Sequence, residues 1–294
     1  MKNHKSGFVT ILGNPNVGKS TLINALVGEQ LSLINKKAQT TRHRILGLIN
    51  EKNYQIVLSD TPGIIKPNYG LQDSMMDFVK GAIIDSDFLI YMVQINQKNI
   101  KDEVIFSKIK SAEIPKILLI NKIDKGDQDK LNETINFWKE KLPNIDIYPI
   151  SALTGFSVKE LINVIVENLP TSPPYFPKDQ FTDKPERFFV NEIVRGEILR
   201  LYSKEIPYSV EVNTVSFIRK NKIIHIGCEI YVEKQTQKGI LIGHKGEALK
   251  KVGIRSRKKL QAFFEKKINI EIFVKVLKNW RNNKKYLKKF GYNI

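Results

Sequence analysis

The sequence predicts an α/β protein of two parts, with a mostly parallel sheet covered by helices on both faces and then a smaller α+β domain. Three observations predict this fold class. Short apolar runs alternate with amphipathic segments of about three helical turns over residues 1–170. Four prolines within residues 170–177 end that alternation, because proline cannot continue a helix or a central strand. After them the order of elements changes and basic residues become more frequent.

In residues 1–170 the sequence predicts strands and helices, which alternate strictly after the second strand. The strands are expected at Phe8–Leu12, Ile45–Ile49, Tyr54–Ser59, Phe88–Val93, Ile117–Ile120 and Ile145–Ile150. The helices are expected near Lys19–Val27, Leu71–Ala82, Ile100–Ser111, Lys130–Lys141 and Val158–Asn168. Helical crossovers make the sheet mainly parallel, and such sheets carry their functional loops at the carboxyl ends of the strands.

From Glu186 onwards the sequence predicts a helix, two strands, a glycine-containing turn, a long basic helix, a strand and a terminal helix. The bounds expected for the first helix and the three strands are Glu186–Leu201, Tyr208–Ile218, Lys222–Val232 and Ile268–Val276. We therefore expect domains at 1–170 and 186–294. The proline-rich residues 171–185 should form an extended, semi-rigid linker between them.

The composition narrows the class of protein. The 294 residues include one cysteine, so no disulfide can form within the chain, and no apolar run approaches the roughly 20 residues that cross a bilayer. We expect a cytoplasmic protein without a transmembrane segment. Residues 1–170 carry 21 Lys and Arg against 18 Asp and Glu, a net charge of +3, whereas residues 171–294 carry 27 against 12, a net charge of +15. This asymmetry favours a polyanion-binding second domain over a general lysine bias of the proteome.

The string Gly13–Ser20 has the GxxxxGKS spacing of a phosphate-binding loop and lies between a predicted strand and a predicted helix. Its backbone N–H groups and the helix N-terminus attract phosphate. Lys19 is expected to contact the β- and γ-phosphates of a nucleoside triphosphate, and Ser20 to ligate Mg²⁺. The nucleotide contacts predicted for this region are Asn14, Asn16, Val17, Gly18, Lys19, Ser20 and Thr21.

Two further segments are expected to respond to the terminal phosphate. Asp60 follows a predicted strand and should hold Mg²⁺, while the Gly63 N–H can approach a γ-phosphate because glycine has no Cβ. A threonine of the segment 36–43 should complete the Mg²⁺ shell; Thr40 and Thr41 both qualify, and we favour Thr41. His43 could act as a base, but a lone loop histidine is more often solvated. The catalytic residues predicted are Lys19, Thr41, Asp60 and Gly63, and the Mg²⁺ ligands Ser20, Thr41 and Asp60.

The string Asn121-Lys122-Ile123-Asp124, after another predicted strand, indicates which base is bound. The Asp124 carboxylate only accepts hydrogen bonds, and guanine offers it two donors that adenine lacks. The stem of Lys122 can lie along the base, and Asn121 can tie this loop to the phosphate-binding loop. After the next strand, Ser151-Ala152-Leu153 can add a backbone N–H from Ala152 to guanine O6.

The second domain contains Gly243-His244-Lys245-Gly246 between two predicted helices, the GxxG turn of a KH RNA-binding module. GxxG is a weak motif alone, but the apolar residues before it, the helix after it and the basic charge support this interpretation. Bases should lie in an apolar groove near Ile240–Ile242 and the neighbouring strand. The predicted RNA contacts are Ile242, Gly243, His244, Lys245, Gly246, Arg255 and Lys258, the last two among basic residues that we place, with Arg257 and Lys259, on one side of the next helix. Phe263 and Phe264 are expected in the core.

The five first-domain motifs resemble those of the translation-factor-related GTPases, and the segment 37–44 is similar to the Era family in particular. The resemblance runs from Phe8 to Tyr292. It implies a P-loop GTPase domain that binds GTP, GDP and Mg²⁺, followed by a type II KH domain. It also implies that the protein binds the 3′ end of small-subunit ribosomal RNA during maturation of the small ribosomal subunit.

Two features of the resemblance concern the reaction. Ile64 stands where Ras-like proteins carry a glutamine that orients water, and an isoleucine side chain cannot do so. Asn16 stands where related GTPases carry an asparagine that ligates K⁺, so K⁺ is a candidate cofactor, with ordinary loop chemistry as the alternative. The hypothesis is slow intrinsic hydrolysis, stimulated by K⁺, RNA or the ribosome.

Three other interpretations compete with this one. A nucleotide kinase would need an acceptor site and would not explain Asn121–Asp124. An RNA-binding protein with a relic nucleotide site would not explain why the site residues are intact: Lys19, Ser20, Asp60 and Asp124. A GTPase at the membrane surface is a milder variant, and we expect a monomer with at most weak peripheral membrane association.

Overall fold

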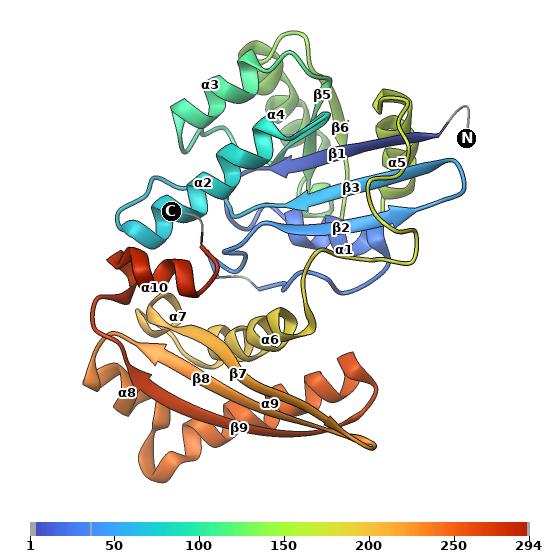
Figure 1. Cartoon of the computed structure of the whole chain (residues 1–294). Helices are drawn as coiled ribbons and strands as arrows, with labels where there is room; N and C mark the ends of the chain where they lie inside the picture. Colours follow the sequence, from blue (N-terminus) through green and yellow to red (C-terminus); the bar gives the residue numbers. More distant parts are fainter. Residues whose placement is uncertain (1–3, 36, 293–294) are drawn as a thin grey trace. The chain divides into compact units, whose positions relative to one another are not determined.

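A computed structural model describes residues 4–35 and 37–292, which fall into two compact units (Figure 1). The first unit comprises residues up to Asn68 together with Gln72–Asp183, and the second comprises Tyr69–Leu71 together with the residues from Lys184 onwards. Lys36, part of the predicted magnesium-binding segment, lies outside the described residues.

The first unit contains a six-stranded sheet in the order β2-β3-β1-β4-β5-β6. All neighbouring strands are parallel except β2, which pairs antiparallel with β3 at one edge. The strands are β1 (Lys5–Leu12), β2 (Ile45–Asn50), β3 (Tyr54–Asp60), β4 (Phe88–Gln94), β5 (Lys116–Asn121) and β6 (Asp146–Pro149). The predicted α/β fold, with its mainly parallel sheet, is confirmed.

Helices cover both faces of this sheet. They are α1 (Lys19–Val27), α2 (Gly70–Ile84), α3 (Glu103–Ser111), α4 (Gln128–Lys141) and α5 (Val158–Asn168), with a 3₁₀ turn at Ile123–Lys125. Apolar side chains of α1 and α5 share one core with inward residues of β1, β3, β4 and β5. On the other face, Tyr91 of β4 packs against Phe106 of α3 and Trp138 of α4. The third helix begins at Glu103 rather than Ile100, because the Asp102 side chain caps it by accepting from the Ile105 N–H at 3.0 Å.

The segment after α5 lies along the first sheet up to residue 183. Gln55 of β3 is completely buried, and its Oε1 accepts a hydrogen bond from the Tyr175 N–H at 2.7 Å. The Leu48 N–H of the edge strand β2 donates to the Phe181 carbonyl at 3.0 Å. These contacts hold an extended, proline-containing chain against the edge of the sheet.

The second unit has the order α6 (Glu186–Leu201), α7 (Ile206–Ser209), β7 (Glu211–Lys220), β8 (Ile223–Val232), α8 (Gln235–Ile242), α9 (Glu247–Phe264), β9 (Lys267–Val276) and α10 (Lys284–Lys289). Its sheet is β7-β8-β9, with β7 and β8 antiparallel and β8 and β9 parallel. The first strand begins at Glu211 rather than at Tyr208, because Tyr208 belongs to the short helix α7, whose first turn contains Pro207.

One apolar core joins α6, α8 and α9 to the sheet of the second unit. Phe264 packs against Phe217 of β7, as expected for a core residue, whereas Phe263 stacks on Phe189 with 40% of its surface exposed. Among residues 4–35 and 37–292, no helix combines the length and the apolar character that crossing a membrane requires.

Candidate nucleotide and nucleic-acid sites

The loop between β1 and α1 is curled tightly against the neighbouring strands. Gly18 has a φ of 110°, and a Cβ at this position would lie 2.2 Å from the Asn121 side-chain nitrogen. The first turn of α1 follows, with its free N–H groups at the end of the loop. This arrangement is a concave row of N–H groups suited to phosphate.

Lys19 folds back over this loop. Its ammonium donates to the carbonyls of Gly13 and Asn14 at 3.1 and 3.2 Å, and its side chain is buried. Burial lowers the pKa of Lys19 to about 8, although the Asp60 carboxylate opposes the shift. A buried ammonium at the mouth of an N–H-lined loop is a strong binding group for an anion.

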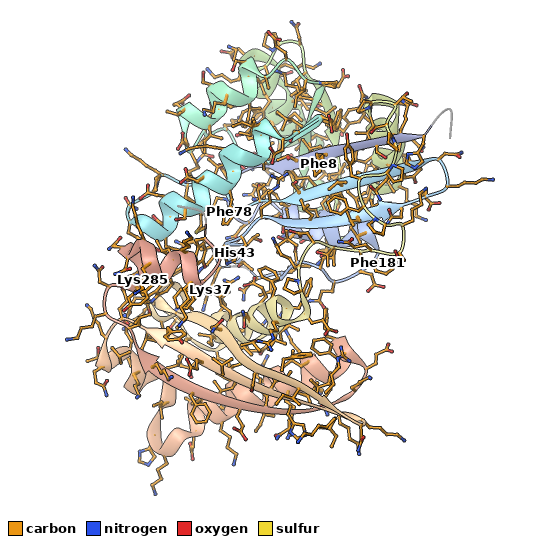
Figure 2. The ribbon with its side chains drawn as sticks, viewed as in Figure 1. Phe8, Lys37, His43, Phe78, Phe181 and Lys285 are labelled. Carbon is orange, nitrogen blue, oxygen red and sulfur yellow. The ribbon has the colours of Figure 1, made fainter. Side chains whose placement is uncertain are left out.

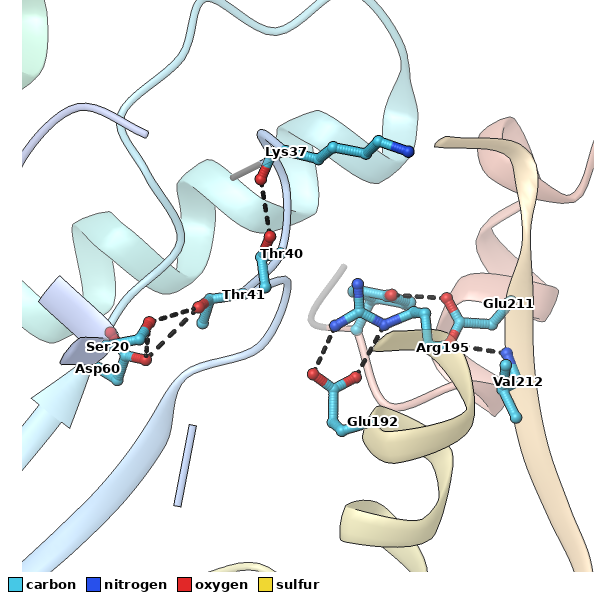
Figure 3. Close-up of polar contacts among 10 residues, drawn as sticks. Ser20, Lys37, Thr40, Thr41, Asp60, Glu192, Arg195, Glu211 and Val212 are labelled. Atoms are coloured by element: carbon cyan, nitrogen blue, oxygen red, sulfur yellow. Dashed lines mark hydrogen bonds and ion pairs between the residues drawn. The ribbon is translucent and has the colours of Figure 1, made fainter. Parts of the chain in front are cut away.

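Ser20, Thr41 and Asp60 come together from α1, the segment before β2 and the end of β3 (Figure 3). The Ser20 hydroxyl donates to Asp60 Oδ2 at 2.8 Å, and the Thr41 hydroxyl lies 3.1 Å from Ser20 Oγ and 3.4 Å from Asp60 Oδ2. Desolvation raises the pKa of Asp60, and the charge of Lys19 and the nearby hydroxyl groups of Ser32, Ser20 and Thr41 oppose this rise. Three oxygen ligands therefore face one point beside the phosphate-binding loop.

Thr40 is turned away from this cluster. Its hydroxyl donates to the Lys37 carbonyl at 2.7 Å (Figure 3). His43 lies against Phe78 of α2, with 5.7 Å between the ring centroids (Figure 2). The geometry thus brings Thr41, and not Thr40, to Ser20 and Asp60.

These residues fit Mg²⁺. Asp60 is completely buried, and its Oδ1 accepts no hydrogen bond from the described residues. A buried carboxylate oxygen without a donor is costly unless a cation or a water molecule satisfies it. Mg²⁺ prefers oxygen ligands and keeps several waters of its own, so the set of two hydroxyls and one carboxylate suits it beside a phosphate chain.

The chain after Asp60 lies against the phosphate-binding loop. The Ile64 N–H donates to the Gly13 carbonyl at 3.0 Å, and a Cβ on Gly63 would lie 2.7 Å from the backbone of Pro15. Ile64 itself is buried. A glycine is therefore required at position 63 for this close approach, and no side-chain donor or acceptor is present at position 64.

The loop after β5 is tied to the phosphate-binding loop through Asn121. Its Nδ2 donates to the Val17 carbonyl at 2.7 Å, and its Oδ1 accepts from the Ala152 N–H at 2.9 Å. The Ala152 N–H, which the sequence assigned to guanine O6, thus has an intramolecular acceptor in this structure. Ser151 donates to Asp124 Oδ1 at 2.6 Å and so orients the carboxylate.

Lys122 and Leu153 flank the same loop. Lys122 has a φ of 63°, and its ammonium donates to the Asn16 carbonyl and, at 2.7 Å, to Gln94 Oε1. Leu153 is 75% exposed, so an apolar side chain is available beside the loop. No sequence motif includes Gln94, and its partner Lys122 is 28 positions away along the chain.

In the second unit, the GxxG turn connects α8 to α9. Gly243 has a φ of 73°, and a Cβ there would lie 2.6 Å from the Ala248 Cβ, so only glycine fits. His244 and Lys245 are exposed on the turn, and Lys245 has a φ of 47°. The turn therefore presents its backbone and two cationic or polar side chains to solvent.

A groove of about 320 Å³ opens next to this turn. The residues that line it come from the turn, α9 and β9: Gly246, Leu249, Lys250, Gly253, Ile254, Arg257, Asn269, Ile270 and Ile272. Of the residues expected beside the bases, Leu241 is buried in the core, and neither Ile240 nor Ile242 lines this groove, so the position of the bases stays a prediction. The groove combines apolar walls with Lys250 and Arg257, a composition suited to bases and phosphates.

Arg255, a predicted RNA contact, forms an ion pair within the protein. Its Nε donates to Glu197 Oε2 of α6 at 2.6 Å, and Lys259 pairs with the same carboxylate at 2.6 Å. Arg257 lies two positions further, about 200° around the helix, and lines the groove. Arg255, Arg257, Lys258 and Lys259 therefore do not share one side of α9. The spacing of Gly246, Lys250, Gly253 and Arg257 is the signal in the sequence that marks the groove face. Lys258 is exposed beside that face.

Comparisons with known proteins cover both units. A family model described as a 50S ribosome-binding GTPase matches residues 8–122, and a KH domain model matches residues 205–281. A variant of Era from Aquifex aeolicus bound to GDP and AlF4⁻ is 38% identical, with a TM-score of 0.94 over 99% of this chain and 100% of its own. Era in complex with MgGDPNP and nucleotides 1506–1542 of 16S ribosomal RNA matches with the same identity, score and coverage.

Proposed function

The chain belongs to the Era family of GTPases, and from this premise we propose that it binds GTP with Mg²⁺, hydrolyses it to GDP and binds the 3′ end of small-subunit ribosomal RNA. Its role is in the maturation of the small ribosomal subunit. We propose that residues 1–170 form the GTPase domain, 171–185 the linker and 186–294 the KH domain.

The convergence of Ser20, Thr41 and Asp60 next to the Lys19 ammonium is the observation that supports the nucleotide site most strongly. Ser20 and Thr41 would ligate Mg²⁺ through their hydroxyls, and Asp60 would hold it through water. Mg²⁺ held there would neutralise charge on the phosphates. Lys19 contacts the same phosphates, and the N–H groups of Asn16, Val17, Gly18, Ser20 and Thr21 surround them.

Guanine is the base that the second loop fits. Ser151 donates to Asp124 Oδ1, and the other carboxylate oxygen would accept from the guanine N–H donors. The stem of Lys122 and the exposed Leu153 would cover the two faces of the base. Asn121 holds this loop to the phosphate-binding loop, and Ala152 donates to guanine O6 once the base is present.

Ile64 is apolar and buried, so its side chain cannot orient the attacking water. Another group must therefore support hydrolysis in this chain. The Gly63 N–H and the Lys19 ammonium stabilise charge on the terminal phosphate. We propose a K⁺ ion beside the Asn16 side chain as the additional cation. A turnover rate equal in Na⁺ and K⁺ buffers would remove K⁺ from the proposal.

The groove of the second unit is the proposed RNA site. The GxxG backbone, with His244 and Lys245, would clamp the sugar–phosphate chain, and bases would enter between α9 and β9. Phosphate contacts would come from Lys250, Arg257 and Lys258. Ile242 is the last residue of α8 and directly precedes the GxxG turn. The net charge of +15 in residues 171–294 favours the same partner.

We further propose that the chain acts as a monomer in the cytoplasm. The lysines of α10 are exposed, but the helix has six residues and buries Leu287, so it has no broad apolar face for a bilayer. Membrane association should be weak and peripheral. Flotation with vesicles of anionic phospholipid tests this, and tight binding at physiological salt would contradict it.

Two measurements test the central proposal. Purified protein with Mg²⁺ should retain GTP and GDP in preference to ATP, and Asp124→Asn should shift the preference from guanine towards xanthine nucleotides. Short oligonucleotides of the small-subunit 3′ end should bind, and Gly243→Asp should weaken that binding while nucleotide affinity is unchanged. A chain that retains neither GTP nor GDP would refute the proposal.

A further inference from the structure

Gln94 is the last residue of β4 and lies opposite Asn121 of β5 in the strand register. Its Oε1 accepts a hydrogen bond from Lys122 Nζ at 2.7 Å, and the same ammonium donates to the Asn16 carbonyl. One ammonium therefore joins three segments: the end of a core strand, the loop that faces the base and the loop that faces the phosphates.

The backbone around Gln94 is held in place. The Gln94 N–H donates to Gln97 Oε1 at 3.3 Å, and the Gln97 N–H returns to the Gln94 carbonyl at 3.0 Å. The Trp138 indole N–H donates to the Gln97 carbonyl at 2.9 Å, which anchors this turn to α4. The Gln94 side chain thus presents its oxygen from a fixed position rather than from a mobile loop.

Lys122 needs such an acceptor. Partial burial lowers the pKa of Lys122, and the nearby Lys125 adds to this shift while Asp124 opposes it. A desolvated ammonium is stable only when hydrogen-bond acceptors replace the lost water. Gln94 supplies one of those acceptors at the end of the side chain whose stem faces the base.

We propose that Gln94 is a positioning residue for guanine-nucleotide binding, which fixes the ammonium of Lys122 between β4 and the phosphate-binding loop. With its end fixed, the Lys122 stem is held flat for contact with the base, and the Asn16 carbonyl is held in the closed loop. This inference rests on the proposed function above. Because Gln94 acts at the base end of the site, its effect should be equal for GTP and GDP.

The test compares variants of the full chain by the affinity and dissociation rate of fluorescent GTP and GDP. Gln94→Leu removes the acceptor and should weaken binding of both nucleotides roughly five- to tenfold, mainly through faster dissociation. Gln94→Glu keeps an acceptor oxygen and should restore most of the affinity. Gln128→Leu, an exposed position on α4, is the matched control and should bind as the wild type does. Gln94→Met, which also lacks the acceptor, replaces the leucine variant if the latter does not fold.

A double-mutant cycle with Lys122→Ala separates positioning from general destabilisation. If Gln94 acts through Lys122, the double variant should bind nucleotide as weakly as Lys122→Ala alone. Additive losses, or unchanged affinity in Gln94→Leu, would overturn the inference. A wild-type chain that retains no guanine nucleotide would instead refute the proposed function and is therefore a distinguishable result.

Discussion

Arg255 Nε donates to Glu197 Oε2 at 2.6 Å, across 58 positions of the sequence. Glu197 of α6 is completely buried and also pairs with Lys259 at 2.6 Å and Arg200 at 3.4 Å. Burial disfavours the charged carboxylate, but hydrogen bonds from Lys259 and Arg255 outweigh it and lower the pKa of Glu197. This cluster fastens α9 to α6 on the side opposite the groove.

Arg255 and Arg257 should therefore separate stability from RNA binding. Arg255→Ala should lower the free energy of unfolding by about 1 kcal/mol or less, since its side chain is half exposed and Lys259 remains, and should leave RNA affinity nearly unchanged. Arg257→Ala should leave stability unchanged, weaken binding of single-stranded RNA, and reduce the slope of affinity against salt by about one unit. Denaturant unfolding and RNA titration at several salt concentrations measure both. The reverse pattern would show that Arg255 faces the RNA.

The two adjacent threonines provide a second matched pair. Thr41→Ala removes a hydroxyl from the Ser20 and Asp60 cluster and should lower the rate of GTP hydrolysis at limiting Mg²⁺ by roughly tenfold or more. Thr40→Ala removes only a hydrogen bond to the Lys37 carbonyl and should have a smaller effect. Titration of Mg²⁺ against turnover makes the comparison. A larger loss in Thr40→Ala would assign the Mg²⁺ ligand to that residue instead.

Local patterns predicted the elements well because each depends on neighbouring residues. The spacing of Gly13–Ser20 and the alternating apolar runs determine the strand–loop–helix order, and both are properties of short windows. The predicted start of the first strand of the second unit, Tyr208, is wrong because Pro207 lies in the first turn of the helix α7, which includes Tyr208. The start of α3 lies at Glu103 rather than Ile100 because Asp102 caps the helix there, and a polar capping residue is no part of an apolar pattern.

Contacts between distant segments could not be predicted in the same way. The Glu197 cluster forms because one particular side of α9 faces α6. The basic residues of α9 alone do not indicate which side that is. Gln94 and Gln55 lie in no motif, and each acts through a partner brought near by the sheet. The location of the groove likewise depends on β9 lying beside α9, which is a property of the tertiary fold.

Nucleotide binding should depend on the protonation of Lys19. In the free protein the pKa of Lys19 is lowered to about 8 by burial, and bound phosphates favour the ammonium form. Affinity for GTP should therefore be constant below pH 8 and fall as pH rises above it, approaching tenfold per unit, until the pKa of the complex is reached. Lys19→Ala should bind more weakly and show only the pH dependence of the nucleotide.

The effect of Lys19 on the free energy of unfolding has the wrong sign to explain a loss of GTP affinity above pH 8 by unfolding. Between about 8 and the ordinary value of 10.5, the unfolded chain binds more protons at this lysine than the folded chain does. The contribution of Lys19 to the free energy of unfolding therefore rises with pH across that window. Melting curves at each pH provide the control, and a GTP affinity independent of pH from 7 to 9 would contradict the assignment of Lys19 to the phosphates.

Gln55 should be a main support of the segment that follows α5. Its Oε1 accepts from the N–H groups of Tyr175 and Phe176 at 2.7 and 3.0 Å, and its Nε2 donates to the Phe176 carbonyl at 2.8 Å and to Asn50 Oδ1 at 2.7 Å. Gln55→Leu removes all four hydrogen bonds and leaves part-buried backbone groups of Tyr175 and Phe176 without these partners, so we expect a loss of about 3 kcal/mol in the free energy of unfolding. Hydrogen exchange at Tyr175 and Phe176 should accelerate, whereas the exposed Gln128→Leu should remain within about 0.5 kcal/mol of the wild type. Unchanged exchange at those two amides in Gln55→Leu would mean that the backbone contacts of β2, and not Gln55, hold this segment to the sheet.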